Sequence, residues 1–409
     1  VLVDPACGSG TLLATVAGQL VKAVRKNQIE PDAVLRSVGS EFYGFDVQPF
    51  AVLLTRLQLT WAGISLLSAC PHVGDDLRNL FTFSNIRLGD PLEQPTQHWQ
   101  PDGQFNYVIG NPPFFKAIAR RLEFLNEYQD VLYGQANLYQ LFLWWAVRAT
   151  KPGGRIAFLI PQSFRSGLYF HKLRQRLADN CDLQAVTLFT NRIGVFDGVD
   201  SPLMAVALQK RVPSPSPETE GTVIVRVSSN RDNLAGRELL AVARERVFLS
   251  HPQGPIWCVS DRLHDYDILN KVYNEATRLA DLAKRFAVQN GGFVWNQHKE
   301  ILRAEAEDGA VPLLSASSVR PFQFNFPVSS LIEKGRQFAL VTSQVAERQR
   351  AGRLALIKRT TPKKSGRRIV ATLISEEFAA NHPAFFVENH LNIIEAHSES
   401  DLACLKGLV

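Results

Sequence analysis

Apolar strands alternate with amphipathic helices from the first residue to about residue 211. Short apolar runs predict strands, and apolar positions with helical spacing predict helices between several of them. This alternation is typical of a mainly parallel sheet with helices on its faces. The predicted strands are Val1–Asp4, Glu41–Asp46, Ile86–Asp90, Phe105–Gly110, Arg155–Ile160, Gln184–Phe189 and Leu203–Gln209, and the predicted helices include Thr11–Arg25, Pro49–Leu59, Asn137–Thr150 and Gly167–Asp179.

The helix predicted at Asn137–Thr150 carries one apolar stripe, which we interpret as core that covers the sheet rather than as a ligand site. The last two predicted strands have no full helix between them, so we expect an antiparallel strand at that edge. The stripe consists of Leu138, Leu141, Phe142, Trp145 and Ala149.

Composition changes at residues 212–221, which read VPSPSPETEG and have little apolar surface to bury. Such a stretch predicts a linker or an exposed loop. We therefore expect an α/β domain over residues 1–211, a linker and connecting segment over 212–275, and an α+β domain, cut short, over 276–409. A chain of 409 residues also exceeds what one core usually organises.

Composition describes a globular chain, with 45% hydrophobic and 21% charged residues. No apolar run approaches the roughly 18–20 residues that span a bilayer, so we expect no membrane partner. Five scattered cysteines without a CxxC pair predict reduced cytoplasmic thiols and no metal site. The chain opens without Met and stops within a helical pattern, so we interpret it as a fragment.

A glycine-rich turn, DPACGSG at Asp4–Gly10, follows the first strand and precedes the first helix. Glycine lets backbone turn tightly and approach a ligand that a Cβ would exclude, and ligands of open parallel sheets bind where the strands end. We predict a cofactor turn that includes Asp4, Ala6, Gly8 and Gly10. The alternative is a simple bend, because the GxGxxG spacing of dinucleotide folds is absent.

Acidic residues also end the next two strands, Asp46 in YGFD and Asp90 in LGDPL. Each alone is compatible with a strand-end cap, but three successive acidic strand ends favour a ligand site. Asp46 is placed to accept ribose hydroxyls, and Asp90 to accept an adenine amino group. A sulfonium ligand carries a positive charge and no phosphate, so acidic edges suit it better than they suit a nucleotide.

The sequence NPPF at Asn111–Phe114 follows the strand FNYVIG and predicts a catalytic loop. The Asn111 side-chain oxygen and the Pro112 carbonyl can each accept a hydrogen bond from an exocyclic amino group. Pro112 and Pro113 hold these acceptors rigid before substrate arrives. Phe114 offers a stacking face for a base, which must leave the duplex to be reached.

Two further residues have competing interpretations. Phe196 is a candidate second aromatic wall for the base, and equally an ordinary core residue at a strand entrance. Cys7 could be a nucleophile for methylation of a pyrimidine carbon, but that chemistry requires a thiol on the catalytic loop. We therefore interpret Cys7 as a small residue that lines the turn.

The order of these motifs resembles the gamma-class amino-methyltransferases of DNA, in particular the large and type IIG enzymes of restriction–modification systems. GFDVQPFAVLLTRLQL, KPGGRIAFLIPQSF and SPLMAVALQK extend the resemblance along residues 44–210. It implies a Rossmann-like sheet of seven strands with one antiparallel strand. It also implies transfer of a methyl group from S-adenosylmethionine to N6 of an adenine in double-stranded DNA.

The resemblance carries cofactor binding onto Asp4, Gly8, Gly10, Asp46 and Asp90, and adenine binding onto Asn111, Pro112 and Phe114. Leu279–Asn296, PLLSASSVRP and VENHLNII resemble parts of a target-recognition domain. Family members have an aromatic-containing motif upstream of the first strand, which this sequence lacks. No nuclease motif is visible, so a nuclease domain or specificity subunit would lie outside this chain.

Basic residues concentrate between Lys334 and Arg368, where eleven Lys and Arg accompany one acidic residue, Glu347, a local net charge of +10. The whole chain has a net charge of +6. This clustering predicts phosphate contacts, whose binding weakens steeply with salt; a solvated basic loop is the alternative. The candidate DNA-binding residues are Arg348, Arg350, Arg353, Lys358, Arg359, Lys363, Lys364, Arg367 and Arg368.

Two other functions are compatible with these motifs. An RNA base or a protein glutamine amide can use the same NPPF arrangement, although such enzymes are generally compact. A catalytically silent DNA-binding subunit would keep the fold, but damage to NPPF or the acidic edges would then be expected, and both are intact.

Overall fold

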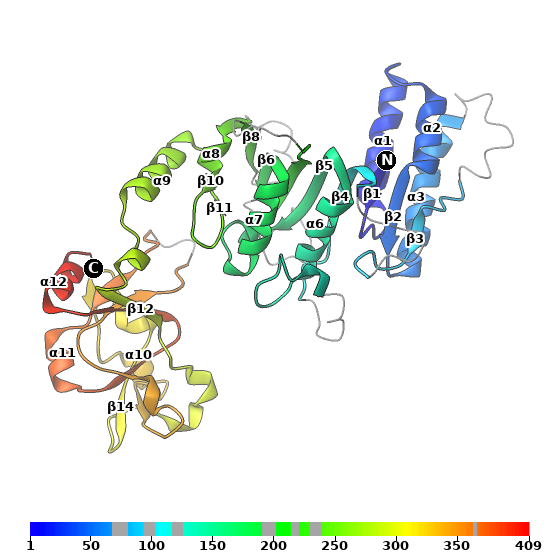
Figure 1. The fold of residues 1–409 in the computed structure, drawn as a ribbon. Helices are drawn as coiled ribbons and strands as arrows, with labels where there is room; N and C mark the ends of the chain where they lie inside the picture. Colours follow the sequence, from blue (N-terminus) through cyan, green and yellow to red (C-terminus); the bar gives the residue numbers. More distant parts are fainter. Residues whose placement is uncertain are drawn as a thin grey trace. The chain divides into compact units, whose positions relative to one another are not determined.

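The computed structural model describes residues 1–67, 81–93, 103–116, 126–189, 202–213, 221–228, 239–362 and 366–408. Contacts divide the chain into two compact units, Val1–Glu275 and Ala276–Val409 (Figure 1). The segment at 221–275, which the sequence analysis assigns to a connector, is part of the first unit.

The first unit contains a nine-stranded sheet in the order β3-β2-β1-β4-β5-β7-β6-β8-β9. Strands β1 to β5 pair in parallel, β7 runs antiparallel to β5 and β6, and β9 runs antiparallel to β8. The fold class is α/β, as predicted. The strands are β1 (Leu2–Asp4), β2 (Phe42–Asp46), β3 (Ile86–Leu88), β4 (Phe105–Gly110), β5 (Thr150–Pro161), β6 (Cys181–Phe189), β7 (Leu203–Lys210), β8 (Thr222–Ser228) and β9 (Leu240–Ala243).

Three features of this sheet differ from the sequence expectation. Strand β5 begins at Thr150, where it already pairs with Phe105, so it includes the KPGG stretch. The antiparallel strand β7 lies between β5 and β6 rather than at an edge. Strands β8 and β9 extend the sheet beyond the seven predicted strands, and Val223 and Val225 of β8 are buried there.

Three helices pack around the first strands. They are α1 (Thr11–Arg25), α2 (Pro31–Ser40) and α3 (Pro49–Leu67). Leu13 and Ala17 of α1 and Leu59 of α3 lie in one apolar cluster with Val34 of α2. The sequence pattern did not predict α2, and α3 continues well beyond the expected end at Leu59.

Helix α3 is long and apolar enough to cross a membrane by length and composition alone, which is weak evidence because core helices pass the same test. One face packs against the sheet, and Arg56 in its middle donates to the Ile86 carbonyl at 2.7 Å. These contacts are those of a sheet-covering helix. Its other face exposes Phe50, Leu53, Leu57, Trp61 and Ile64.

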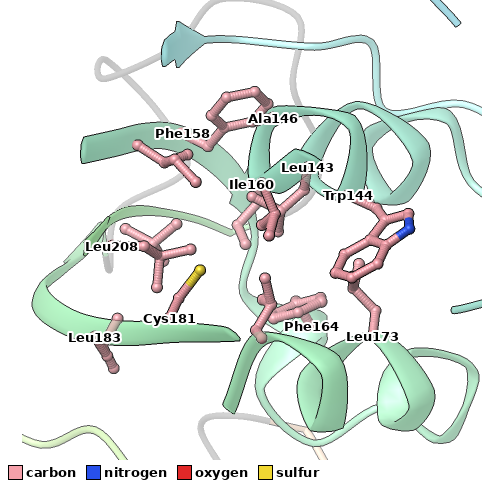
Figure 2. Close-up of a cluster of buried hydrophobic side chains, with 14 of the residues drawn as sticks. Leu143, Trp144, Ala146, Phe158, Ile160, Phe164, Leu173, Cys181, Leu183 and Leu208 are labelled. Atoms are coloured by element: carbon pink, nitrogen blue, oxygen red, sulfur yellow. The ribbon is translucent and has the colours of Figure 1, made fainter. Parts of the chain in front are cut away.

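A second apolar core joins α6 (Leu138–Ala149) and α7 (His171–Asn180) to strands β4–β8. Figure 2 shows Leu143 of α6, Ile160 of β5 and Leu173 of α7 in this core. The predicted stripe on α6 is buried except for its first member, Leu138, which is half-buried. Burial extends around the helix because the sheet, α7 and nearby aromatic residues enclose it: Tyr139, Gln140, Leu143, Trp144, Ala146 and Val147 are buried too.

Shorter elements complete the first unit after β9. They are α8 (Arg244–Val247), the β10–β11 pair (Phe248–Leu249 with Ile256–Trp257) and α9 (Leu263–Glu275). Arg174 of α7 holds part of this segment, because its Nε donates to the Pro255 carbonyl at 2.6 Å. Its Nη1 donates to the carbonyls of Phe164 and Gly167, each at 2.8 Å.

The second unit is built from short strands in two main sheets, β12-β22-β19-β20 and β13-β17-β14-β21-β18, with a β15–β16 pair beside them. The strands are β12 (Phe286–Asn290), β13 (Leu302–Arg303), β14 (Ala310–Leu314), β15 (Val319–Arg320), β16 (Gln323–Phe324), β17 (Phe338–Leu340), β18 (Gln349–Arg350), β19 (Ala355–Lys358), β20 (Ala371–Leu373), β21 (Phe385–Val387) and β22 (Leu391–Ala396), and the helices are α10 (Ser329–Ile332), α11 (Glu376–Asn381) and α12 (Glu399–Leu408).

Candidate active site

The turn after β1 needs glycine at one position and leaves open space at another. Gly10 caps α1 at φ 86°, and a Cβ there would lie 2.8 Å from the Thr55 Cα. Gly8 has φ 54°, but a Cβ there would meet nothing within 4 Å. The backbone at Gly8 is therefore open to an approaching ligand.

Asp46 at the end of β2 holds this turn. Its Oδ2 accepts from the Gly8 N–H at 2.9 Å, and its Oδ1 accepts from the Gln48 N–H at 2.8 Å. The Thr55 hydroxyl donates to the Gly8 carbonyl at 2.9 Å from the other side. Because each carboxylate oxygen has a second lone pair, Asp46 can also accept from ligand hydroxyls.

Asp4 is a buried carboxyl group beside Asp46. Burial raises its pKa to about 7, the hydrogen bond from the Ala6 N–H lowers it, and the charge of Asp46 raises it. This bond measures 3.1 Å to Asp4 Oδ1. Two carboxyl groups at adjacent strand ends form an acidic region that a cationic ligand would stabilise.

The third acidic residue, Asp90, follows β3 by two residues and forms a turn. Its Oδ1 accepts from the Leu92 N–H at 3.0 Å. The Gly89 N–H donates to the Asp46 carbonyl at 2.9 Å. The ends of β2 and β3 are therefore tied together, and the three predicted acidic residues share one edge of the sheet.

Asn111 follows β4, which lies directly beside β1. The two strands are parallel, with Leu2 opposite Tyr107 and Val3 opposite Val108. Their carboxyl ends therefore lie on the same edge, where the glycine turn is. Asn111 is exposed, Pro112 is buried, and Pro113 and Phe114 are half-buried.

The Asn111–Phe114 loop is held by residues that were not predicted to belong to the site. The Phe114 ring packs edge-on against Tyr139, with ring centroids 6.3 Å apart. The Leu138 N–H donates to the Phe115 carbonyl at 3.0 Å, and Lys116 forms a β-bridge with Asn137. The beginning of α6 therefore anchors the loop. The run NLYQ does contain a capping pattern, Asn137 with Gln140, but no local signal shows what that helix end contacts.

The Cys7 thiol is buried, and burial raises its pKa to about 12. A thiol in this state supplies little thiolate near neutral pH, which disfavours a nucleophilic role. Among the residues that the structure describes, no three or more His, Cys, Asp or Glu side chains gather in a way that could hold a metal ion.

Phe196, Lys363 and Lys364 lie outside the described residues. The remaining predicted DNA-binding residues all belong to the second unit. Arg348 and Arg350 each contact a side chain of the same unit: Arg348 Nη1 lies 3.1 Å from His298 Nε2, and Arg350 Nη2 donates to Gln289 Oε1 at 3.1 Å.

Arg353 forms an ion pair with Glu376, which offsets part of its positive charge. Arg359 Nη1 donates to the Asn389 carbonyl at 2.6 Å, and the Arg367 guanidinium lies over the Phe322 ring. Lys358 ends β19, and Arg368 is exposed. Because its charge is partly offset, we expect Arg353 to contribute less to anion binding than an arginine without a carboxylate partner would.

Residues 40–196 match the family described as Eco57I restriction-modification methylase. The matched stretch covers less than half of the chain. It contains Asp46, Asp90 and the whole Asn111–Phe114 loop, so the family match covers much of the edge described above. The sequence resemblance to restriction–modification methylases is thereby confirmed.

Proteins similar to this chain include the type II methyltransferases M.PstI of Providencia stuartii and M.BsuBI of Bacillus subtilis. M.PstI is 26% identical over 310 residues, 75% of this chain and 59% of that protein. M.BsuBI is 25% identical over 294 residues, 71% of this chain and 56% of that protein. The adenine-specific methyltransferase PglX of Streptomyces coelicolor is 28% identical over 178 residues, 36% of this chain and 14% of that protein. The chain spans less than two thirds of each of these relatives.

Solved structures with a similar fold include the type IIL restriction-modification enzyme MmeI in complex with DNA. It has a TM-score of 0.56 at 13% identity and covers 99% of this chain and 58% of that one. The DrdV–DNA complex has a TM-score of 0.54 at 11% identity and covers 98% of this chain and 46% of that one. The similarity of fold therefore extends beyond the Eco57I-type stretch.

Proposed function

We propose that this protein transfers a methyl group from S-adenosylmethionine to the N6 amino group of a flipped-out adenine in duplex DNA. The observation that carries the proposal is the pairing of β4 with β1. This pairing brings Asn111 to the same edge of the sheet as the Gly8 turn and Asp46, which supports a site that the proposed substrate acceptors and cofactor residues share.

The residues of the glycine turn fit this cofactor. The space at Gly8 admits a ligand against the backbone, and Asp46 has lone pairs left for ribose hydroxyls. Asp46 provides negative charge for a cationic ligand, and such a ligand would favour the ionised form of Asp4, whose pKa burial raises to about 7. When bound, S-adenosylmethionine supplies an electrophilic methyl group on a sulfonium ion.

The Asn111–Phe114 loop would perform the substrate half of the reaction. The Asn111 side-chain oxygen and the Pro112 carbonyl accept hydrogen bonds from the adenine amino group and draw its lone pair out of conjugation with the ring. Two prolines keep these acceptors in place, which is the condition for electrostatic preorganisation. Phe114, held edge-on by Tyr139, presents its face to the base.

The relatives favour adenine in DNA over an RNA base or a protein glutamine amide as the substrate. PglX is named adenine-specific, and the similar folds of MmeI and DrdV come from complexes with DNA. The second unit would recognise the target through the basic residues between Lys334 and Arg368, which would contact phosphate.

Methyl transfer can be tested with a tritiated donor. We expect the purified protein to label duplex DNA, and methylation-sensitive sequencing of DNA from expressing cells to place the label on adenine. Asn111→Ala should abolish labelling while DNA binding, measured by fluorescence anisotropy, is retained. Labelling confined to RNA or to protein would refute the DNA proposal, and labelling of DNA by Asn111→Ala at the wild-type rate would refute the role of the loop.

A further inference from the structure

Exposed aromatic and apolar side chains gather beside the Asn111–Phe114 loop. We call Phe115, Tyr133, Leu168 and Tyr169 the aromatic patch; their exposed fractions are 59%, 44%, 45% and 51%. They come from the residue after Phe114, the loop before α6, and the 3-10 helix Leu168–Phe170 that precedes α7. Neighbouring aromatic residues such as Tyr128, Tyr139 and Phe170 are buried, so exposure is a property of the patch and not of the region.

Specific contacts hold the patch in shape. The Tyr133 ring packs edge-on against His171 with ring centroids 4.8 Å apart. Gly134 has φ 64°, and a Cβ there would come within 2.8 Å of the Tyr169 ring, so Tyr169 lies directly over the glycine. The Tyr133 ring therefore has a fixed partner in His171, and the Tyr169 ring lies over the residue that follows Tyr133.

The same contacts connect the patch to the catalytic loop. Gln140 Nε2 donates to the Tyr169 carbonyl at 3.2 Å, while Gln140 Oε1 accepts from the Asn137 N–H at 2.9 Å. Asn137 forms the β-bridge with Lys116, and the Leu138 N–H bonds the Phe115 carbonyl. The beginning of α6 thus positions both the patch and the loop.

Two lysines lie on the segments that carry the patch. Lys116 is exposed next to Phe115, and Lys172 follows His171 at the start of α7, where its Nζ donates to the Gln129 carbonyl at 3.2 Å. The nearby Asp130 is paired with Arg176 at 3.4 Å. Aromatic faces among cationic side chains suit a strand of nucleic acid, whose bases stack and whose phosphates are negative.

We propose that the aromatic patch binds the DNA strand next to the flipped adenine and stacks on a base or sugar that flipping exposes. This inference rests on the proposed function, because removal of one base from the duplex leaves its neighbours partly unstacked. The position of the patch favours DNA over other ligands. Phe115 directly follows Phe114, so a DNA strand whose flipped base lies on Phe114 would pass the patch. A protein partner would have no such reason to touch the catalytic loop.

The test compares Tyr133→Ala/Tyr169→Ala with Tyr133→Phe/Tyr169→Phe and with Trp61→Ala. Trp61 is an exposed aromatic residue on α3 in the same unit and serves as the control. Steady-state kinetics should show KM for duplex DNA raised about tenfold per lost stacking partner, with binding of S-adenosylhomocysteine unchanged. The phenylalanine variant, which keeps both rings, should restore KM, and Trp61→Ala should match the wild type.

A spectroscopic measurement separates binding from folding. The fluorescence of 2-aminopurine placed one nucleotide from the target adenine should be quenched by stacking in the wild type and should rise in the alanine variant. If the alanine pair does not fold, Tyr169→Ala and Tyr133→Ala are measured singly. Unchanged KM and fluorescence in a folded variant would overturn the patch proposal, whereas failure of the wild type to methylate DNA would overturn the proposed function instead.

Discussion

Three glycines of the first unit should respond differently to alanine, because they differ in conformation and in surrounding space. Gly18 lies inside α1 with nothing within 4 Å of its Cβ position. Alanine there should raise the free energy of unfolding by about 1 kcal/mol through helix propensity. Gly8 has positive φ but no steric conflict, so Gly8→Ala should cost about 1–2 kcal/mol.

Gly10→Ala should lower the free energy of unfolding more than Gly8→Ala does, because backbone strain and a steric collision add. Its positive φ costs about 1–2 kcal/mol for a residue with a Cβ. The new Cβ would also lie 2.8 Å from the Thr55 Cα and 2.9 Å from Thr55 Cγ2 and Oγ1. Carbon atoms prefer a separation of about 3.5–4.0 Å, so α3 must shift, and overpacking of this kind costs about 1–3 kcal/mol. The expected loss is therefore about 2–5 kcal/mol.

Urea denaturation of the full chain measures the stabilities, and titration calorimetry with S-adenosylhomocysteine measures cofactor affinity. From most to least stable, the expected order is Gly18→Ala, wild type, Gly8→Ala and Gly10→Ala. Gly8→Ala should weaken the cofactor at least tenfold, because its methyl group fills the open space above the turn. Equal stability of the Gly8 and Gly10 variants would refute the steric reasoning at Thr55, and wild-type affinity in Gly8→Ala would show that the ligand does not occupy that space.

Three further predictions concern residues around the site. Tyr139→Leu removes the ring that packs against Phe114, so kcat should fall about tenfold and the free energy of unfolding by about 2–3 kcal/mol. Tyr139→Phe keeps the ring and should retain both kcat and stability. Unchanged kcat in the leucine variant would contradict the supporting role of this ring. Asp4 has a folded pKa of about 7 against an ordinary value of 3.8, so the folded state binds its proton more firmly. Stability should therefore fall as pH rises from about 4 to 7, by up to about 4 kcal/mol, and Asp4→Asn should abolish that fall in denaturation curves at pH 5 and pH 8. Arg174→Met leaves the carbonyls of Phe164, Gly167 and Pro255 without this donor and should lower the free energy of unfolding by about 3–5 kcal/mol. Arg174→Lys should recover only part of this loss, because lysine lacks the guanidinium fork. Full recovery by lysine would contradict the role of the fork.

Much of the first unit could be predicted from local sequence. Strand β4 and helix α1 have the predicted bounds, and the other predicted strands of the unit fall at or near the expected residues. Local pattern suffices here because the spacing of apolar residues distinguishes a strand from a helix, and glycine marks a turn. The edge that holds Asp4, Asp46 and Asn111 then follows from strand direction, since parallel strands end on the same side.

Other features depend on contacts between distant residues, and only the tertiary structure decided them. Phe114 packs against Tyr139, Arg353 forms an ion pair with Glu376, and β8 pairs with β6 and β9. No local pattern encodes which partner a ring, a charge or a strand edge will find, because such choices depend on the packing of the whole unit. The sequence by itself therefore determined most strands of the first unit and the residue types at the site, while the fold determined what holds them in place.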